Sequence, residues 1–306
     1  MIDEVPRYPR SGYRAAVLGH PIAHSLSPVL HRSAYQALGL ADRTYDALDV
    51  DEQGLAEFLA GRGEGWAGWS LTMPLKRAVR PLLVRETDLA RAVGAVNTVL
   101  VAPDGLEGFN TDVHGIVAAF GEGGISAGAG AGAGAAGPSR NAVVLGGGAT
   151  AASALAALAE LGCAEPVVHV RSAARSADLR EAAARLGVRV RLEPFEAAAV
   201  ADSLRGADLV VSTLPAGVAD ELADSWATEA AAVRRPTLLD VVYDPWPTRL
   251  ARAWSAAGAP VVGGFVMLVH QAHGQVYLMT GRRPPVDEMR AAGEAELRRR
   301  RSARSA

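Results

Sequence analysis

Residues 141–162, "NAVVLGGGATAASALAALAELG", decide the fold of this chain of 306 residues. The stretch begins with apolar residues typical of a buried β-strand and ends with an alanine-rich segment typical of a helix. Between them, Gly146, Gly148 and Ala151 fit the pattern G-x-G-x-x-A. A strand, a tight glycine turn and a helix N-terminus together present backbone N–H groups to a pyrophosphate. The sequence therefore predicts a dinucleotide site formed by Gly146, Gly147, Gly148 and Ala149, the alternative being a glycine-rich turn without a ligand.

Strands and helices alternate on both sides of this stretch. Apolar strands are expected after it at 165–170, 188–192, 208–215 and 237–243, and before it at 14–19, 44–50 and 68–74. Residues 94–112 carry the turn signal "PDG" and are typical of a hairpin. Alternating strands and helices favour a mostly parallel sheet. We therefore expect an α/β fold of two domains, an N-terminal α/β substrate domain and a Rossmann-like dinucleotide-binding domain.

The expected boundaries follow the composition of the chain. The substrate domain is expected at 1–115, completed by a helical segment at 265–295, and the nucleotide domain at 140–262. Residues 116–139 are rich in Gly and Ala and are expected to be flexible. The arginine-rich tail, 296–306, is expected to be disordered.

Composition excludes several classes of protein. A net charge of −2 argues against a nucleic-acid or anionic-membrane partner, and no apolar run has the length of a membrane span. The single cysteine, Cys163, excludes an internal disulfide. With no signal-peptide pattern at the N-terminus, a cytoplasmic location is expected. His270 and His273 lie three residues apart without a further ligand on that face, so no metal is expected.

The end of the second strand of the nucleotide domain indicates which dinucleotide binds. NAD enzymes usually place Asp or Glu there, to bind the ribose 2′-hydroxyl. This chain has Arg171, Ser172 and Arg175 instead. Two guanidinium groups can bind a 2′-phosphate, which favours NADP. The alternative is that both arginines are solvated surface charges.

Polar side chains gather at three turns in the first half of the chain. Ser25 and Ser27 precede a predicted helix, where two hydroxyls and a positive helix end suit a carboxylate. Thr72 and Lys76 follow a strand, and Asn97 and Asp112 flank the predicted hairpin. Each also has an ordinary structural explanation: Ser27 as a helix N-cap, Asn97 as a turn residue and Asp112 as a helix cap. A shared small-molecule substrate site becomes the better interpretation because the second half supplies a cofactor.

At these residues the chain resembles the shikimate dehydrogenase family. The matching motifs run in the family's order, from about Val17 to Gly281: "GHPIAHSLSPVLH", "SLTMPLK", "GAVNT", "NTDVHG", "VVLGGGATA", "VRSAAR", "VVSTLPAG", "LLDVVYDPWPT" and "GGFVMLVHQA". The forms "WSLTMPLK" and "YDPWPT" are similar to the actinobacterial branch. The resemblance implies reversible, NADPH-dependent reduction of 3-dehydroshikimate to shikimate in aromatic amino acid biosynthesis.

The resemblance also implies roles for individual residues. Ser25 and Ser27 would hold the substrate carboxylate with Tyr243 nearby, and Thr72, Asn97, Asp112 and Gln271 would bond the ring hydroxyls. Lys76 and Asp112 would be the catalytic pair at the reacting oxygen. Besides the glycine turn and the two arginines, Ser172, Thr213, Gly264 and Met267 would contact the cofactor.

Lys76 is the only lysine in the chain. Reduction of a ketone adds a hydride to carbon and a proton to oxygen, and an ammonium group can release a proton where a guanidinium effectively cannot. This explains a lysine in a chain that otherwise uses arginine. Whether Lys76 transfers the proton or only orients the substrate is left open by the sequence.

Two departures from the family pattern bear on specificity. Ser70 stands where many members have a substrate-binding Asn, and Val170 stands where many begin an Asn-Arg-Thr motif. A quinate or dual-specificity dehydrogenase would share the motifs, and a non-catalytic NADP-binding regulator would not need Lys76 and Asp112. The oligomeric state, monomer or homodimer, is also left open.

Overall fold

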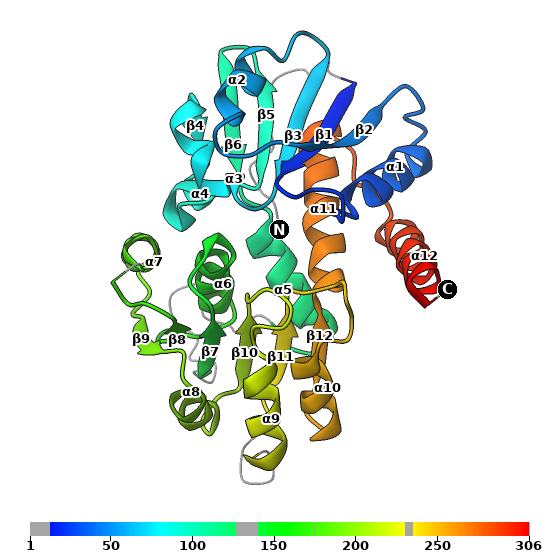
Figure 1. Cartoon of the computed structure of the whole chain (residues 1–306). Helices are drawn as coiled ribbons and strands as arrows, with labels where there is room; N and C mark the ends of the chain where they lie inside the picture. The colour runs from blue at the N-terminus through cyan, green and yellow to red at the C-terminus, as the bar shows by residue number, and fades with distance from the viewer. Residues whose placement is uncertain (1–12, 127–139, 175, 230–234, 306) are drawn as a thin grey trace. The chain divides into compact units, whose positions relative to one another are not determined.

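The computed structural model describes residues 13–126, 140–174, 176–229 and 235–305 (Figure 1). The described chain divides into two compact units. The first holds the residues up to Arg91, Ala95–Thr111 and those from Val269 onward, and the second holds Ala92–Gly94 and Asp112–Leu268. The expected α/β class with two mostly parallel sheets is confirmed.

The first unit is built on a six-stranded sheet with the order β2-β1-β3-β5-β6-β4. Strands β1, β2 and β3 are parallel, and β5 pairs antiparallel with both β3 and β6 as the expected hairpin. Trp69 and Leu18 are fully buried in its core. The strands are β1 (Arg14–Gly19), β2 (Thr44–Asp49), β3 (Trp66–Leu71), β4 (Arg85–Glu86), β5 (Thr98–Ala102) and β6 (Gly105–Phe109).

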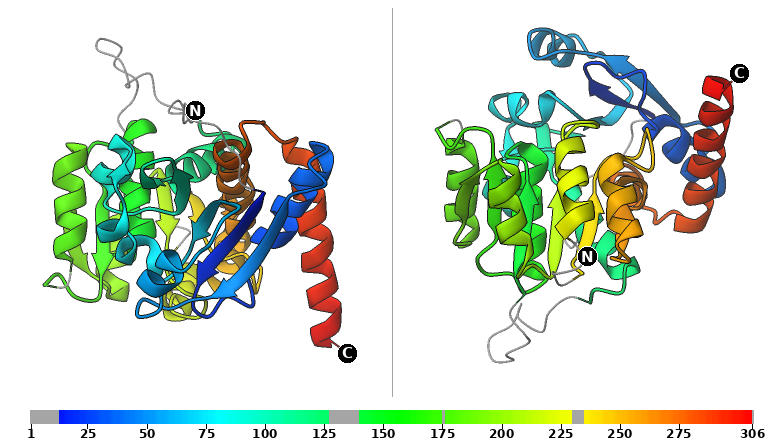
Figure 2. Two further views of the ribbon diagram at one scale, coloured as in Figure 1. Left: turned by 90° about the horizontal axis from the view of Figure 1, so that it is seen from above. Right: turned by 60° about the horizontal axis from the view of Figure 1, so that its bottom comes forward.

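Short helices connect these strands, and two C-terminal helices complete the unit. The connecting elements are α1 (Ser27–Ala37), α2 (Leu55–Ala60), α3 (Leu75–Ala78), the 3-10 turn Arg80–Leu82 and α4 (Asp88–Val93). The chain returns to this unit within α11 (Gly264–Thr280) and ends with α12 (Val286–Ser305). Figure 2 shows α12 alongside α1, against which it packs.

The second unit is a doubly wound sheet in which all six strands are parallel, in the order β12-β11-β10-β7-β8-β9. Its strands are β7 (Ala142–Leu145), β8 (Val167–Val170), β9 (Arg191–Pro194), β10 (Leu209–Ser212), β11 (Thr237–Asp240) and β12 (Val261–Gly263). Its helices are α5 (Asp112–Glu122), α6 (Ala149–Glu160), α7 (Ala177–Leu186), α8 (Ala197–Leu204), α9 (Asp220–Glu229) and α10 (Arg249–Ala256). Residues 141–162 therefore form β7, a glycine turn and α6, as predicted.

Two expectations from composition are wrong. The tail is not disordered between 296 and 305, because α12 continues through it and buries Met289, Gly293 and Leu297 at four-residue spacing. The predicted Gly/Ala segment also begins too early. Residues 116–122 belong to α5, whose apolar face includes the buried Ile116 and Phe120. Residues 127–139 lie outside the described part of the chain.

Candidate active site

In the first unit, backbone hydrogen bonds join the turns that carry the predicted substrate residues. Thr72 N–H donates to the Leu18 carbonyl at 2.9 Å, which ties the turn after β3 to the end of β1. The Lys76 carbonyl accepts from Val96 N–H at 2.8 Å, and Leu71 N–H donates to the Asn97 carbonyl at 2.8 Å. Thr72, Lys76 and Asn97 therefore lie around one region at the ends of β1 and β3, as parallel neighbouring strands require.

Ser25 lies on the loop between β1 and α1, and Ser27 follows it at the start of α1. The Ser25 hydroxyl oxygen accepts from Ser27 N–H at 3.2 Å. Ser27 is nearly buried and is the first residue of α1, while Leu26 occupies the N-cap position without any side-chain cap. The capping role considered for Ser27 is therefore wrong. The side chain that satisfies a backbone N–H at this helix end is that of Ser25.

A buried amide network connects α11 to the start of β5. Asn97 Oδ1 accepts from Thr111 N–H at 2.8 Å, and a backbone N–H can only donate. The other amide atom of Asn97 is therefore its NH2 group, which donates to Gln271 Oε1 at 3.2 Å. Two predicted substrate residues are thus in direct contact, and backbone groups fix which way their amides face.

Gln275 lies one helical turn beyond Gln271 and is the centre of this network. Its Nε2 donates to the Asn97 carbonyl at 3.1 Å and to Thr98 Oγ1 at 3.2 Å. Because a carbonyl only accepts, the opposite atom is Oε1, which accepts from the Ser70 hydroxyl at 2.9 Å. Gln275 is not among the residues predicted from sequence, although two glutamines four residues apart in an apolar helix are a visible signal.

The direction of these bonds continues to Tyr45. Since Ser70 donates to Gln275, its oxygen accepts the Tyr45 hydroxyl proton, at 2.6 Å. The Ser27 hydroxyl is a further hydrogen-bond partner of Tyr45, whose pKa is raised well above its usual value by burial. Ser70 is therefore part of the support behind Asn97 and Ser27, a role that sequence reasoning did not foresee.

His31 closes the network on the side of α1. Its ring stacks on Tyr45 with centroids 3.8 Å apart, and its Nε2 lies 3.3 Å from Gln275 Oε1. That oxygen accepts, so Nε2 carries the hydrogen, and Nδ1 has no partner among the described residues. Burial lowers the pKa of His31 to about 3. His31 is consequently a neutral donor that helps to orient Gln275.

Lys76 and Asp112 belong to different units. Lys76 is half-buried on α3 in the first unit. Asp112 is buried at the start of α5 and is the first residue after Thr111 to be grouped with the second unit. Their pairing stays a prediction.

In the second unit, the glycine turn has the local geometry that a pyrophosphate needs. Gly146 adopts φ +107°, and a Cβ there would lie 2.5 Å from Thr213 Oγ1, so only glycine fits. A Cβ on Gly148 would meet nothing within 4 Å, so the turn is open at the N-terminus of α6. That helix begins at Ala149 with no side-chain cap and no acidic residue in its first turn. Uncapped N–H groups beside an open turn fit a bound diphosphate.

The residues predicted to select NADP lie one strand away from this turn. Arg171 is exposed directly after β8, which pairs with β7, and Ser172 is half-buried beside it. Arg175 lies outside the described residues. A Cβ on Gly147 would lie 2.9 Å from Val170 Cγ1, so Val170 packs closely against the glycine turn. Thr213 donates its hydroxyl to the Leu145 carbonyl at 2.9 Å, which places it at the same strand ends.

The remaining cofactor and substrate candidates lie around β11 and α11. Gly264 begins α11, and a Cβ there would lie 2.0 Å from the Val241 carbonyl oxygen, so the helix starts in close contact with the strand end. Met267 is buried one turn later, and Tyr243 is half-buried in the loop after β11. Met267, Gln271 and Gln275 follow one another at four-residue spacing and share one face of α11.

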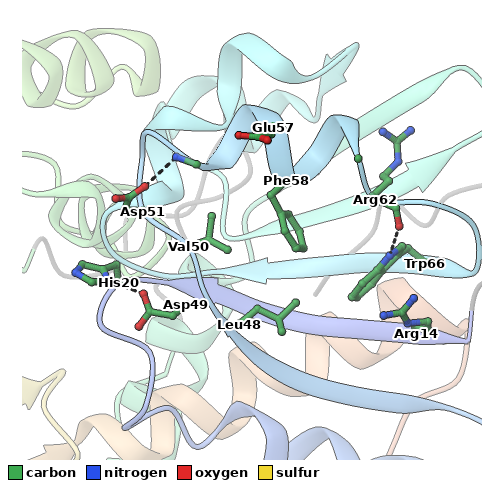
Figure 3. Close-up of a pocket in the computed structure, with 12 residues that line it drawn as sticks. Arg14, His20, Leu48, Asp49, Val50, Asp51, Glu57, Phe58, Arg62 and Trp66 are labelled. Atoms are coloured by element: carbon green, nitrogen blue, oxygen red, sulfur yellow. Dashed lines mark hydrogen bonds and ion pairs between the residues drawn. The ribbon is translucent and has the colours of Figure 1, made fainter.

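A separate hollow of about 780 Å³ lies over β1, β2, β3 and α2 in the first unit (Figure 3). Among its lining residues, His20 pairs with Asp49 at 2.5 Å and Arg14 lies over the Trp66 ring at 4.3 Å from the centroid. None of its lining residues is a predicted site residue. His20 and Asp49 are more than half exposed and pair with each other. We therefore assign the chemistry to the buried network and not to this hollow.

The described residues contain neither a candidate membrane span nor a candidate metal centre. No helix there is long and apolar enough to cross a membrane. Within the same residues, no group of three or more His, Cys, Asp or Glu side chains could hold a metal ion.

Comparison with known proteins agrees with the fold described above. Residues 17–99 match the model of the shikimate dehydrogenase substrate binding domain, and residues 264–292 match that of the shikimate 5'-dehydrogenase C-terminal domain. A relative from Geobacter metallireducens, "Shikimate dehydrogenase (NADP(+))", is 35% identical over 92% of this chain and 96% of its own length.

Solved structures give the same result. The shikimate dehydrogenase of Mycobacterium tuberculosis is 40% identical, with a TM-score of 0.79, over 92% of this chain and 99% of its own. The enzyme from Thermus thermophilus, solved in complex with NADP(H) and shikimate, is 33% identical, with a TM-score of 0.75, over 92% of this chain and 98% of its own. On this similarity along nearly its whole length, the chain belongs to the shikimate dehydrogenase family.

Proposed function

We infer that this chain catalyses the reversible, NADPH-dependent reduction of 3-dehydroshikimate to shikimate. One observation carries this conclusion. Thr72, Lys76, Asn97 and Gln271 converge in the first unit, in a chain whose relatives over nine-tenths of its length are NADP-dependent shikimate dehydrogenases. The open glycine turn in the second unit supports the cofactor assignment, with Arg171 as the residue that recognises its 2′-phosphate.

Each part of the substrate would meet a group of matching chemistry. Ser25 and Ser27 would bind the carboxylate, with Tyr243 nearby. The amides of Asn97 and Gln271, the Thr72 hydroxyl and the Asp112 carboxylate would bond the ring hydroxyls. Because the Asn97 and Gln271 amides are fixed by the buried network, they would be oriented before the substrate arrives. Preorganised polar groups are the main source of stabilisation of a transition state.

Bound NADPH supplies the hydride. Lys76 would stabilise the negative charge that grows on the carbonyl oxygen and would lie in the path of the proton which that oxygen takes up. Asp112 would hold the ammonium group in place.

The decisive assay measures NADP reduction with shikimate and with quinate, each repeated with NAD. We expect a clear preference for shikimate and NADP. A quinate or dual-specificity dehydrogenase would instead oxidise quinate at a comparable kcat/KM. No turnover with either substrate, in a protein that still binds NADPH, would indicate a non-catalytic regulator.

We further propose that the enzyme works in the cytoplasm, as a monomer or homodimer, and without a nucleic-acid partner. A single buried cysteine and no disulfide suit a reducing compartment, and a net charge of −2 gives no electrostatic attraction to nucleic acid. Analytical ultracentrifugation would decide the oligomeric state.

A further inference from the structure

The last helix of the chain reaches the loop that carries Ser25. Helix α12 packs against α1 (Figure 1), and the Ser33 hydroxyl donates to the Glu288 carbonyl at 3.1 Å. Its residues Met289, Gly293 and Leu297 are buried at four-residue spacing. These positions form one stripe along the helix. The stripe continues to Arg300, whose side chain is only 18% exposed although it lies within an arginine-rich run.

Arg300 bonds the backbone of the loop on both sides of Ser25. Its Nη1 donates to the His24 carbonyl at 2.8 Å and its Nη2 to the Ser25 carbonyl at 3.3 Å. Its Nε donates to Glu296 Oε1 at 2.8 Å, one turn back on α12. A planar guanidinium with three bonds in fixed directions holds these groups in one arrangement.

These contacts set the direction of the Ser25 side chain. The two carbonyls belong to the peptide units before and after Ser25, and the orientation of those units determines where its Cα–Cβ bond points. Ser25 N–H also donates to the Ile22 carbonyl at 2.9 Å, and its hydroxyl oxygen accepts from Ser27 N–H. Arg300 and the turn thus hold Ser25 from opposite sides.

Arg299 provides a natural comparison on the same helix. It also bonds Glu296, at 2.8 Å, but its side chain is 70% exposed and its described partners do not include the loop. Together the two arginines lower the pKa of Glu296 to about 2. Glu296 therefore stays ionised at neutral pH and anchors Arg300.

We propose that Arg300 is a positioning residue that holds the Ser25 hydroxyl in the orientation required to bind the substrate carboxylate. This inference rests on the proposed function. It assigns a role in substrate binding to a segment whose composition alone suggests a disordered tail.

The test is steady-state kinetics on Arg300→Ala, with Arg299→Ala as the matched control. We expect the shikimate KM of Arg300→Ala to rise about tenfold, the order of one hydrogen bond to a charged group. The kcat and the KM for NADP should stay within about twofold of the parent values. The shikimate KM of Arg299→Ala should resemble that of the parent. Arg300→Lys keeps the positive charge but lacks the planar guanidinium, so its KM should lie between those of the parent and Arg300→Ala.

A double variant separates positioning from general support of the fold. Because Arg300 acts through Ser25, adding Arg300→Ala to Ser25→Ala should raise KM by less than about twofold. An unchanged KM in Arg300→Ala, an equal rise in Arg299→Ala, or additive effects in the double variant would each overturn the proposal. Should Arg300→Ala fail to fold by circular dichroism, Arg300→Lys and Arg300→Gln provide the same comparison.

Failure of the proposed function would look different. If Ser25→Ala also leaves KM unchanged, the loop does not bind the carboxylate. If the parent does not oxidise shikimate, the assigned activity itself is wrong.

Discussion

Lys76 is the residue at which we expect side-chain chemistry to be most restricted. We expect Lys76→Arg to lower kcat at least about a hundredfold, because a guanidinium is bulkier and too basic to exchange a proton near neutral pH. The shikimate KM should change much less. The neighbouring swap Arg77→Lys, on the same short helix, is the control and should keep near-parental kcat. A folded Lys76→Arg variant with parental kcat would show that only positive charge is needed.

The lowered pKa of His31 predicts how the stability of the protein depends on pH. Its pKa is about 3 in the folded protein, because of burial, against an ordinary value of 6.5. Above pH 6.5 it is neutral in both states. Below that pH the unfolded chain gains a proton that the folded chain cannot accept. The contribution of His31 to the free energy of unfolding should therefore fall by about 1.4 kcal/mol for each pH unit between pH 6.5 and pH 3.

Urea denaturation between pH 4 and pH 8 measures this contribution. The parent should lose stability more steeply with falling pH than His31→Asn, which has no group to titrate. Equal slopes in the two proteins would contradict a neutral, buried His31.

Some residues could be singled out from sequence and others could not, for a physical reason. Gly146 and Arg171 are marked by their positions after strands, which is local information. The role of Ser70 depends on Tyr45 and on Gln275, which is 205 residues away in the chain. No periodicity in the sequence reports such a contact, so the support behind the site became visible only in the folded chain.

At the scale of elements, α11 supplies both a predicted substrate residue and its support. Gln275→Leu would leave the Ser70 hydroxyl and His31 Nε2–H without their buried acceptor. Each unsatisfied buried group costs about 1–3 kcal/mol, so the free energy of unfolding should fall by at least about 2 kcal/mol. The exposed Gln36→Leu on α1 is the control and should change it by less than about 0.5 kcal/mol.

Gln275→Glu separates the bonds that Gln275 accepts from those that it donates. A carboxylate can still accept from Ser70 and His31, but it cannot donate to the Asn97 carbonyl or to Thr98. We expect kcat/KM for shikimate to fall, even where the protein remains folded, because the Asn97 carbonyl loses this donor and so does Thr98, whose hydroxyl bonds Asn97 Oδ1. Parental kcat/KM in a folded Gln275→Glu variant would show that Asn97 needs no such support.

The sequence signals for elements were reliable where hydrophobic periodicity was strong. The strands and the helix from Ala149 follow from apolar runs and glycine turns. The end of the chain was misjudged because its arginines dominate the composition. The buried stripe of Met289, Gly293 and Leu297 was present in the sequence, but its partner surface on α1 was not.

At the scale of the whole molecule, Ser25 is assigned to substrate in the first unit and Arg171 to the cofactor in the second, and thermal unfolding can test this division. A ligand that binds only the folded state stabilises it by about 2.7 kcal/mol at a hundred times its Kd, which raises the Tm by several degrees. The parent should respond to NADPH and to shikimate, each added alone. Arg171→Asp should lose most of the response to NADPH and keep the response to shikimate.

Ser25→Ala should show the reverse, losing the response to shikimate and keeping that to NADPH, because Ser25 lies in the first unit and the glycine turn in the second. NADH supplies a further control: it should stabilise the parent less than NADPH, and Arg171→Asp should reduce or invert that difference, since an acid suits a ribose 2′-hydroxyl and repels a 2′-phosphate. Loss of the NADPH response in Ser25→Ala, or of the shikimate response in Arg171→Asp, would contradict the roles assigned to these two residues.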